Sequence, residues 1–94
     1  MTTIRWTETA DIAYITLLRK VYDRSTEAAL ALDLQLEKLL ERLRQFRYHC
    51  PPLENIPGLR RCLITQNLGL VYDVSGDEIT IISVYDTRAD NPFQ

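Results

Sequence analysis

The 94-residue sequence lacks a long apolar run, and its first residues do not show the pattern of a signal peptide. Although 46% of the residues are hydrophobic, no apolar run approaches the roughly 18–20 residues that cross a bilayer. The opening residues, MTTIRWTETAD, contain no apolar block after a basic start, so no signal peptide is expected. We therefore predict a cytoplasmic protein without membrane contact. The length predicts a single domain over residues 1–94, because chains of this size form one core.

Cysteine and histidine are also scarce. The chain contains only Cys50, Cys62 and His49 of these two residue types. Without a leader, a reducing compartment is expected, which predicts free thiols rather than a disulfide. The spacing of these residues does not resemble a zinc site. No metal and no other cofactor are therefore expected.

The sequence has no excess of positive charge, because its formal net charge is −2. The cations are unevenly distributed, and five arginines fall within twenty residues: Arg42, Arg44, Arg47, Arg60 and Arg61. After Cys62 the only cation is Arg88. This pattern predicts a basic patch on a neutral-to-acidic body. It excludes broad, salt-driven nucleic-acid binding, which needs a chain that is basic throughout.

Apolar residues at three- and four-residue intervals between Thr7 and Phe46 predict two helices. Thr7 and Ser25 are suitable N-caps. The first apolar stripe consists of Ala10, Tyr14, Leu17, Leu18 and Val21, widened by Ile15. The second consists of Leu32, Leu36, Leu39, Leu40, Leu43 and Phe46. Because the link between the helices is short, an antiparallel hairpin is expected, with both stripes in the core.

Alternating or continuous apolar segments predict strands before and after the helices. These segments are Ile4–Thr7, Leu59–Thr65, Leu68–Val74 and Ile79–Val84, and Pro51-Pro52 and Pro57-Gly58 separate the second helix from the second strand. The last strand is apolar on both faces, as expected for a central strand. The predicted fold is therefore α+β with two layers, in which an N-terminal helical hairpin packs on a mostly antiparallel sheet of about four strands. Periodicity leaves open whether the first strand pairs at a sheet edge or beside a later strand.

Arginines stand at both ends of the segment from Leu59 to Pro92. Arg60 and Arg61 lie at its entrance, and Arg88 lies at its exit. A guanidinium offers a planar fork of donors that suits phosphate and carboxylate. We therefore expect a functional site where these arginines converge. The structural alternatives are that the entrance pair contacts Glu54 and that Arg88 forms an ion-pair cluster with Asp86 and Asp90.

Four segments in this order resemble the RelE/ParE superfamily of type II toxin–antitoxin toxins: IRWTETADIAYI, GLRRCLI, LGLVYDV and ITIISVYDTRADNP. The resemblance covers essentially the whole chain. It implies a cognate antitoxin that neutralises the toxin and binds operator DNA. The toxin would then be associated with operator DNA only indirectly, through the antitoxin. It also implies one of two targets, DNA gyrase for ParE-like members or ribosome-bound mRNA for RelE-like members.

The resemblance also suggests residues for a site. Arg61, or its neighbour Arg60, matches the arginine on the strand after the helices, and Arg88 matches the arginine after the last strand. Tyr85 could supply a hydroxyl or stack a base. Arg61, Arg88 and Tyr85 are thus the catalytic candidates. The candidates for contact with a target or a phosphate are Arg60, Arg61, Arg88 and Arg47.

The sequence departs from the ribonuclease branches of the superfamily in the proton-transfer residues. The segment from Tyr48 to Gly58 contains no lysine, no tyrosine follows Arg88, and the single histidine, His49, lies in a proline-rich loop. Cleavage of RNA needs a base, an acid and cations, and only the cations are visible. The first hypothesis is therefore a toxin that binds a protein target such as DNA gyrase. The alternatives are a ribosome-dependent mRNA endoribonuclease and an inactive member that serves as an antitoxin-binding scaffold.

Overall fold

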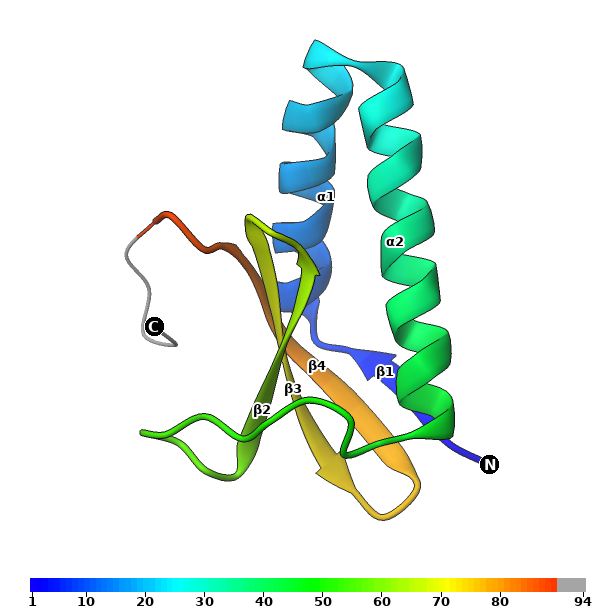
Figure 1. Ribbon diagram of the computed structural model, residues 1–94, viewed down its shortest axis with the longest axis vertical. Helices are drawn as coiled ribbons and strands as arrows, with labels where there is room; N and C mark the ends of the chain where they lie inside the picture. Colours follow the sequence, from blue (N-terminus) through cyan, green and yellow to red (C-terminus); the bar gives the residue numbers. More distant parts are fainter. Residues whose placement is uncertain (90–94) are drawn as a thin grey trace.

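The computed structural model describes residues 1–89, and its elements follow the predicted strand–helix–helix–strand–strand–strand order (Figure 1). The elements are β1 (Thr3–Trp6), α1 (Glu8–Arg24), α2 (Thr26–Gln45), β2 (Leu59–Thr65), β3 (Leu68–Ser75) and β4 (Glu78–Asp86). Figure 1 shows the two helices side by side, with their joined end projecting beyond the end of the sheet. The predicted α+β architecture is confirmed.

The helices form the expected antiparallel hairpin because both predicted caps are in place. The Thr7 hydroxyl accepts a hydrogen bond from the Ala10 N–H at 3.1 Å, and the Ser25 hydroxyl accepts one from the Ala28 N–H at 3.1 Å. Ser25 ends α1 and caps α2 at the same time, which makes the turn tight. In the described part of the chain, neither helix is long and apolar enough to cross a membrane.

The sheet has the order β1-β4-β3-β2. β2, β3 and β4 are antiparallel neighbours, whereas β1 runs parallel to β4 and forms one edge. This placement answers the question that periodicity left open for the first strand. It also makes β4 a central strand, as its two apolar faces predict.

The main core lies between the helical hairpin and one face of the sheet. It buries the leucines of the second helical stripe together with Leu70, Tyr72, Ile79 and Ile81. A smaller cluster of Leu53, Val71 and Tyr85 covers the other face. Two predicted core residues are wrong: Phe46 is 61% exposed and Ile15 is 41% exposed. Phe46 is the C-cap of α2, beyond the last turn that faces the sheet, and Ile15 lies on the flank of α1 away from the core.

The prediction of free thiols is also wrong, because Cys50 and Cys62 form a disulfide in this structure. Their Cα atoms lie 5.4 Å apart, and both residues are buried. The bond joins β2 to the segment between α2 and β2, residues 46–58, which we call the connector. The two cysteines are brought together by the pairing of the connector with β2, through hydrogen bonds from Arg61 N to Pro51 O and from Leu53 N to Leu59 O.

Candidate binding surface and its arginines

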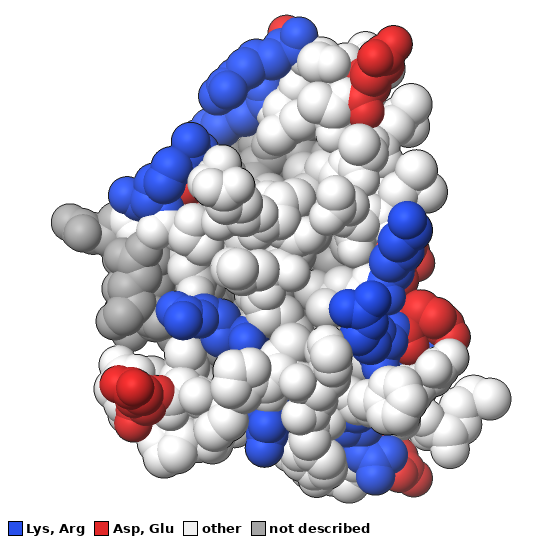
Figure 2. Space-filling view, in the orientation of Figure 1, with Lys and Arg blue, Asp and Glu red and all other residues white. Residues whose placement is uncertain are grey.

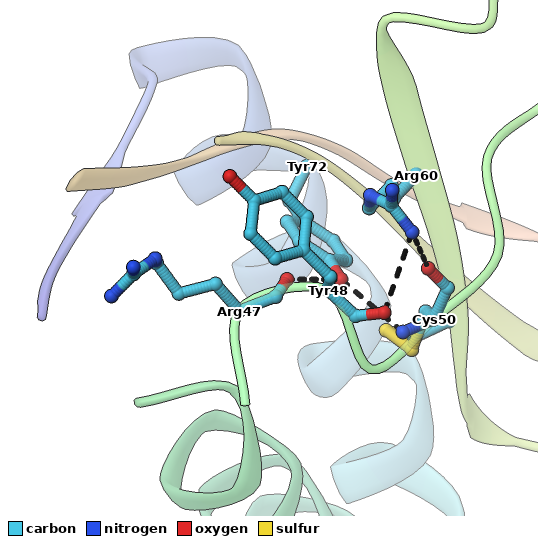
Figure 3. Close-up of a disulfide and its surroundings, with 6 residues drawn as sticks. Arg47, Tyr48, Cys50, Arg60 and Tyr72 are labelled. Atoms are coloured by element: carbon cyan, nitrogen blue, oxygen red, sulfur yellow. Dashed lines mark hydrogen bonds between the residues drawn. A yellow bond between two sulfur atoms is a disulfide. The ribbon is translucent and has the colours of Figure 1, made fainter. Parts of the chain in front are cut away.

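Tyr72 fastens the connector to the centre of the sheet (Figure 3). Its hydroxyl accepts a hydrogen bond from the Cys50 N–H at 3.3 Å and donates one to the Arg47 carbonyl at 2.8 Å. The side chain is fully buried in β3. Burial raises the pKa of Tyr72, although the Cys50 N–H and Arg60 act in the opposite direction. Tyr72 therefore acts as a neutral structural anchor.

Arg60 and Arg47 are two of the predicted contact residues. The Arg60 side chain holds the connector (Figure 3), and the Arg47 side chain links the start of the connector to other segments. Arg60 donates to the carbonyls of Cys50 at 2.7 Å and Tyr48 at 3.4 Å, and its guanidinium carbon lies 4.9 Å from the centre of the Tyr48 ring. Arg47 donates to the Thr2 hydroxyl at 3.4 Å and lies 3.6 Å from the Asp77 carboxylate. The Arg60 guanidinium thus contacts backbone carbonyls rather than Glu54.

Arg61 and Tyr85 lie on the sheet face that is turned away from the helices. In the strand register Arg61 pairs with Val71, and Gly69 pairs with Tyr85. The Tyr85 ring lies so close over Gly69 that a Cβ atom there would be 2.6 Å from its Cζ atom. Tyr85 is buried in the smaller cluster, whereas Arg61 is exposed.

Arg88 lies at the opposite end of the sheet from Arg60 and Arg61. β2 and β4 run in the same direction, because each is antiparallel to β3. Arg61 pairs with Val71, whereas Asp86 at the end of β4 pairs with Leu68, so the two positions are three residues or about 10 Å apart along the strands. The backbone positions of the entrance and exit arginines are therefore separated along the sheet, whereas Arg61 and Tyr85 share its outer face.

The Arg88 side chain is held by Asp86. Its Nε and Nη2 atoms donate to the two carboxylate oxygens at 3.0 and 2.9 Å, and its backbone N–H also donates to Oδ1 at 2.9 Å. These hydrogen bonds lower the pKa of Asp86 to about 2. The predicted pairing of Arg88 with Asp86 is confirmed, whereas Asp90 lies outside the described residues.

The depressed pKa of Asp86 predicts a pH effect on stability. A carboxyl whose pKa is lower in the folded than in the unfolded chain stabilises the fold above its ordinary pKa, near 4, and loses this contribution as the pH falls toward 2. Denaturant unfolding between about pH 6 and pH 2 should therefore show a smaller acid-induced loss for Asp86→Asn than for the unaltered chain. Identical pH profiles would contradict the assignment. Glu54→Gln is the control, because Glu54 is an exposed carboxylate that forms no ion pair among the described residues.

A groove follows α2 on the side next to β2, and we call it the α2 groove. It consists of three neighbouring cavities of about 390, 420 and 540 Å³, which share Gln35, Lys38 and Arg42 between successive members. Its apolar lining comprises Leu17, Val21, Ala28, Ala31, Leu32, Leu39, Leu63, Ile64, Leu68 and Phe46. Its cations are Lys20, Arg24, Lys38, Arg42 and Arg88.

Cations lie on both borders of the α2 groove. Figure 2 shows Lys and Arg side chains on either side of a central area of uncharged residues. The acidic residues in its lining are Glu41, which pairs with Arg44, and Asp86, which pairs with Arg88. The groove can therefore receive an extended or helical segment that presents apolar side chains and carboxylates. Within residues 1–89, no group of three or more metal-ligating side chains is placed to hold a metal ion.

The α2 groove was missed in the sequence, because its residues are contributed by both helices, β2 and the ends of β3 and β4. One signal was available. Lys38 and Arg42 are one turn apart on α2 and follow Ala31 and Gln35 along the same side, next to the buried stripe. Small and basic residues that border a core stripe in this way indicate a groove beside the helix.

The chain is a small α+β protein whose α2 groove is lined by apolar and basic side chains. The chain belongs to the family described as the ParE toxin of the type II toxin-antitoxin system parDE, which it matches over residues 4–91. It is thus a toxin of the RelE/ParE superfamily, and its class implies a cognate antitoxin. The predicted resemblance is confirmed. Comparison with curated proteins gives no match.

Solved structures share the fold at low sequence identity. The chain is similar to a structure of the chromosomal ParDE system from P. aeruginosa, with 22% identity, a TM-score of 0.67, and coverage of 92% of this chain and 96% of that chain. It is also similar to a copper-bound mutant toxin from Helicobacter pylori, with 19% identity, a TM-score of 0.70, and coverage of 94% of this chain and 97% of that chain. A YoeB/ParE toxin from Agrobacterium tumefaciens shows 17% identity and a TM-score of 0.66, with coverage of 90% of this chain and 98% of that chain. These likenesses support the fold.

Proposed function

We propose that this toxin inhibits growth by binding a protein target such as DNA gyrase, and that its antitoxin occupies the α2 groove. The observation that carries the proposal is the separation of the arginines. Arg61 and Tyr85 lie on the outer sheet face, whereas Arg88 is held by Asp86 at the other end of the sheet. A phosphodiester-cleaving site needs cations and proton-transfer groups around one phosphate. Stoichiometric binding needs only an exposed surface.

The chemistry of the α2 groove supports an acidic, amphipathic antitoxin segment. Lys38 and Arg42 are exposed on one border, and Lys20 and Arg24 are exposed on the other. Leu32 and Leu39 are part of the core and form the floor between them. A helix with apolar side chains at three- and four-residue intervals and flanking carboxylates complements this arrangement. Such pairing steers association and selects the partner.

The test of the target is brief induction of the chain without its antitoxin. We expect growth arrest, inhibition or trapping of DNA gyrase in a supercoiling assay with the purified chain, and no new RNA ends positioned by codons. If new RNA ends appear at codon positions and DNA supercoiling is unaffected, the proposal is wrong and the chain is an mRNA endoribonuclease. Unaffected growth, with folded protein present, would favour the inactive scaffold.

The test of the groove is a charge reversal on α2. Lys38→Glu combined with Arg42→Glu should weaken antitoxin binding by at least tenfold, because like charges across an interface are costly. Binding is measured by calorimetry with the product of the neighbouring gene. The control is Arg5→Glu, because Arg5 is exposed on β1, at the opposite edge of the sheet from β2 and the groove. Equal affinity of the α2 variant and the control would place the antitoxin elsewhere.

A further inference from the structure

The face of the helical hairpin turned away from the sheet carries large exposed apolar side chains. On α1 these are Ile12, Ile15 and Tyr22, which follow a three- and four-residue spacing with Arg19 among them. At about 100° per residue they lie roughly opposite Ala10 and the other core positions of α1. This stripe therefore makes no contribution to the main core.

α2 repeats the pattern with Glu27, Leu30, Leu34 and Glu37. The apolar members of the two stripes are 41–62% exposed. The α2 stripe also lies roughly opposite its core positions, which include Leu32 and Leu39. We call the two stripes together the outer hairpin surface. A contiguous apolar surface of this kind on a small protein indicates an interaction site.

The contact between Tyr14 and Asp33 sets the relative heights of the two stripes. The Tyr14 hydroxyl lies 2.7 Å from the Asp33 carboxylate, and the helices are antiparallel. Each residue after Tyr14 in α1 therefore lies level with one residue further before Asp33 in α2. Ile15 then lies at the height midway between Leu30 and Leu34. Arg19 lies at the height of Ala28, next to Glu27.

We propose that a second copy of this chain covers the outer hairpin surface and completes a two-fold symmetric four-helix bundle. A two-fold axis parallel to the helices places α1 of one copy on α2 of the other without changing the heights. Ile15 then enters the space between Leu30 and Leu34 of the second copy. This is the arrangement by which side chains interdigitate between packed helices. The surface is self-complementary, as a two-fold interface requires.

The charges on the two stripes agree with this occupant. The symmetry places Arg19 of one copy next to Glu27 of the other, and the contact occurs twice. Both residues are exposed, and neither forms an ion pair within the described part of one chain. At the other end of the surface the same symmetry brings Glu8 close to Glu37, which opposes association. The balance makes the dimer sensitive to single charges.

The size of the surface also fits a dimer. α1 has 17 residues and is therefore about 25 Å long, and packed helices lie about 9 Å apart. The two helices thus present a corrugated face of about 25 by 20 Å. Such a face covers about 500 Å² on each copy, or about 1,000 Å² in total, which is the lower bound for a specific interface. It leaves the α2 groove accessible, because the groove opens toward β2.

The test measures the mass of the purified full chain by sedimentation equilibrium. We expect a concentration-dependent mass approaching twice 10.9 kDa, with a dissociation constant raised at least tenfold by Leu34→Glu. Ile56→Glu is the control and should leave the constant unchanged, since Ile56 is an exposed apolar residue of the connector, outside both the hairpin and the α2 groove. Circular dichroism establishes that each variant is folded.

A charge swap separates this interface from a general loss of solubility. Arg19→Glu should weaken the dimer by about tenfold, because it places two carboxylates together at each of two symmetric contacts. Adding Glu27→Arg should restore the constant to within about threefold, and Glu37→Gln alone should strengthen association several-fold. A monomeric chain at about 100 μM, or a double variant as weak as the single one, would overturn the proposal. The measurement is independent of toxicity and of the target.

Discussion

Replacement of Tyr72 by alanine is expected to lower the free energy of unfolding by about 3–5 kcal/mol. The side chain is fully buried between the helices and the sheet, so its removal leaves a large cavity. Its hydroxyl also satisfies the Cys50 N–H and the Arg47 carbonyl, which would lose their partner. For a chain of this size the loss is a large part of the total stability. Denaturant unfolding monitored by circular dichroism measures it.

Tyr72→Phe separates the two contributions. Phenylalanine fills nearly the same volume but leaves the connector groups without their hydrogen bonds, which should cost about 1–3 kcal/mol. Amide exchange should then increase at Cys50, because its N–H is bound to the tyrosine hydroxyl. If Tyr72→Phe is as stable as the unaltered chain, the hydroxyl does not anchor the connector and its position reflects packing alone.

Replacement of Gly69 by alanine is expected to destabilise the chain by about 1–3 kcal/mol. A Cβ atom at this position would lie 2.6 Å from Cζ and 2.8 Å from the hydroxyl oxygen of Tyr85. The ring is buried against Leu53 and Val71, so it cannot move aside without disturbing the smaller cluster. The unfolding free energy in urea measures the effect. Gly58→Ala is the matched control and should be nearly neutral, because a Cβ atom added at Gly58 would have no other atom within 4 Å.

A double-mutant cycle identifies Tyr85 as the cause. In the background of Tyr85→Ala the ring is absent, so Gly69→Ala should cost little or become favourable, because alanine suits a strand better than glycine. The expected coupling energy is therefore about as large as the cost of Gly69→Ala itself. Purely additive effects would mean that the close approach of the ring does not determine the choice of glycine.

Most of the secondary structure could be predicted because its signals are local. Thr7 and Ser25 cap their helices through contacts three residues away, and the α2 stripe repeats within one element. The turn at Gly76 has φ = 57°, which favours glycine, and it lies between the two predicted strands. Phe46 was misassigned because periodicity continues past the point where α2 leaves the sheet.

The candidate site was predicted less well, because it depends on how strands are ordered and directed. Arg61 and Arg88 flank one segment in the sequence, yet the two hairpin turns send the ends of that segment to opposite ends of the sheet. The pairing of Cys50 with Cys62 depends on the connector lying against β2, which no local pattern indicates. Free thiols were predicted from the expected reducing compartment, an argument that does not consider how close the two cysteines lie in the fold.

The sequence alone thus determined the order of the elements, the central place of the last strand, and the toxin family, because caps, periodicity and the four resembling segments are read along the chain. The tertiary structure decided which contacts Arg47, Arg60 and Arg88 make and where the α2 groove lies. Arg60 holds the connector, Arg47 links its start to other segments, and Arg88 is held by Asp86. The α2 groove exists only where Lys38 and Arg42 of one helix face Leu63 and Ile64 of a distant strand. Such surfaces depend on contacts between residues far apart in sequence, and these contacts form only when the layers pack.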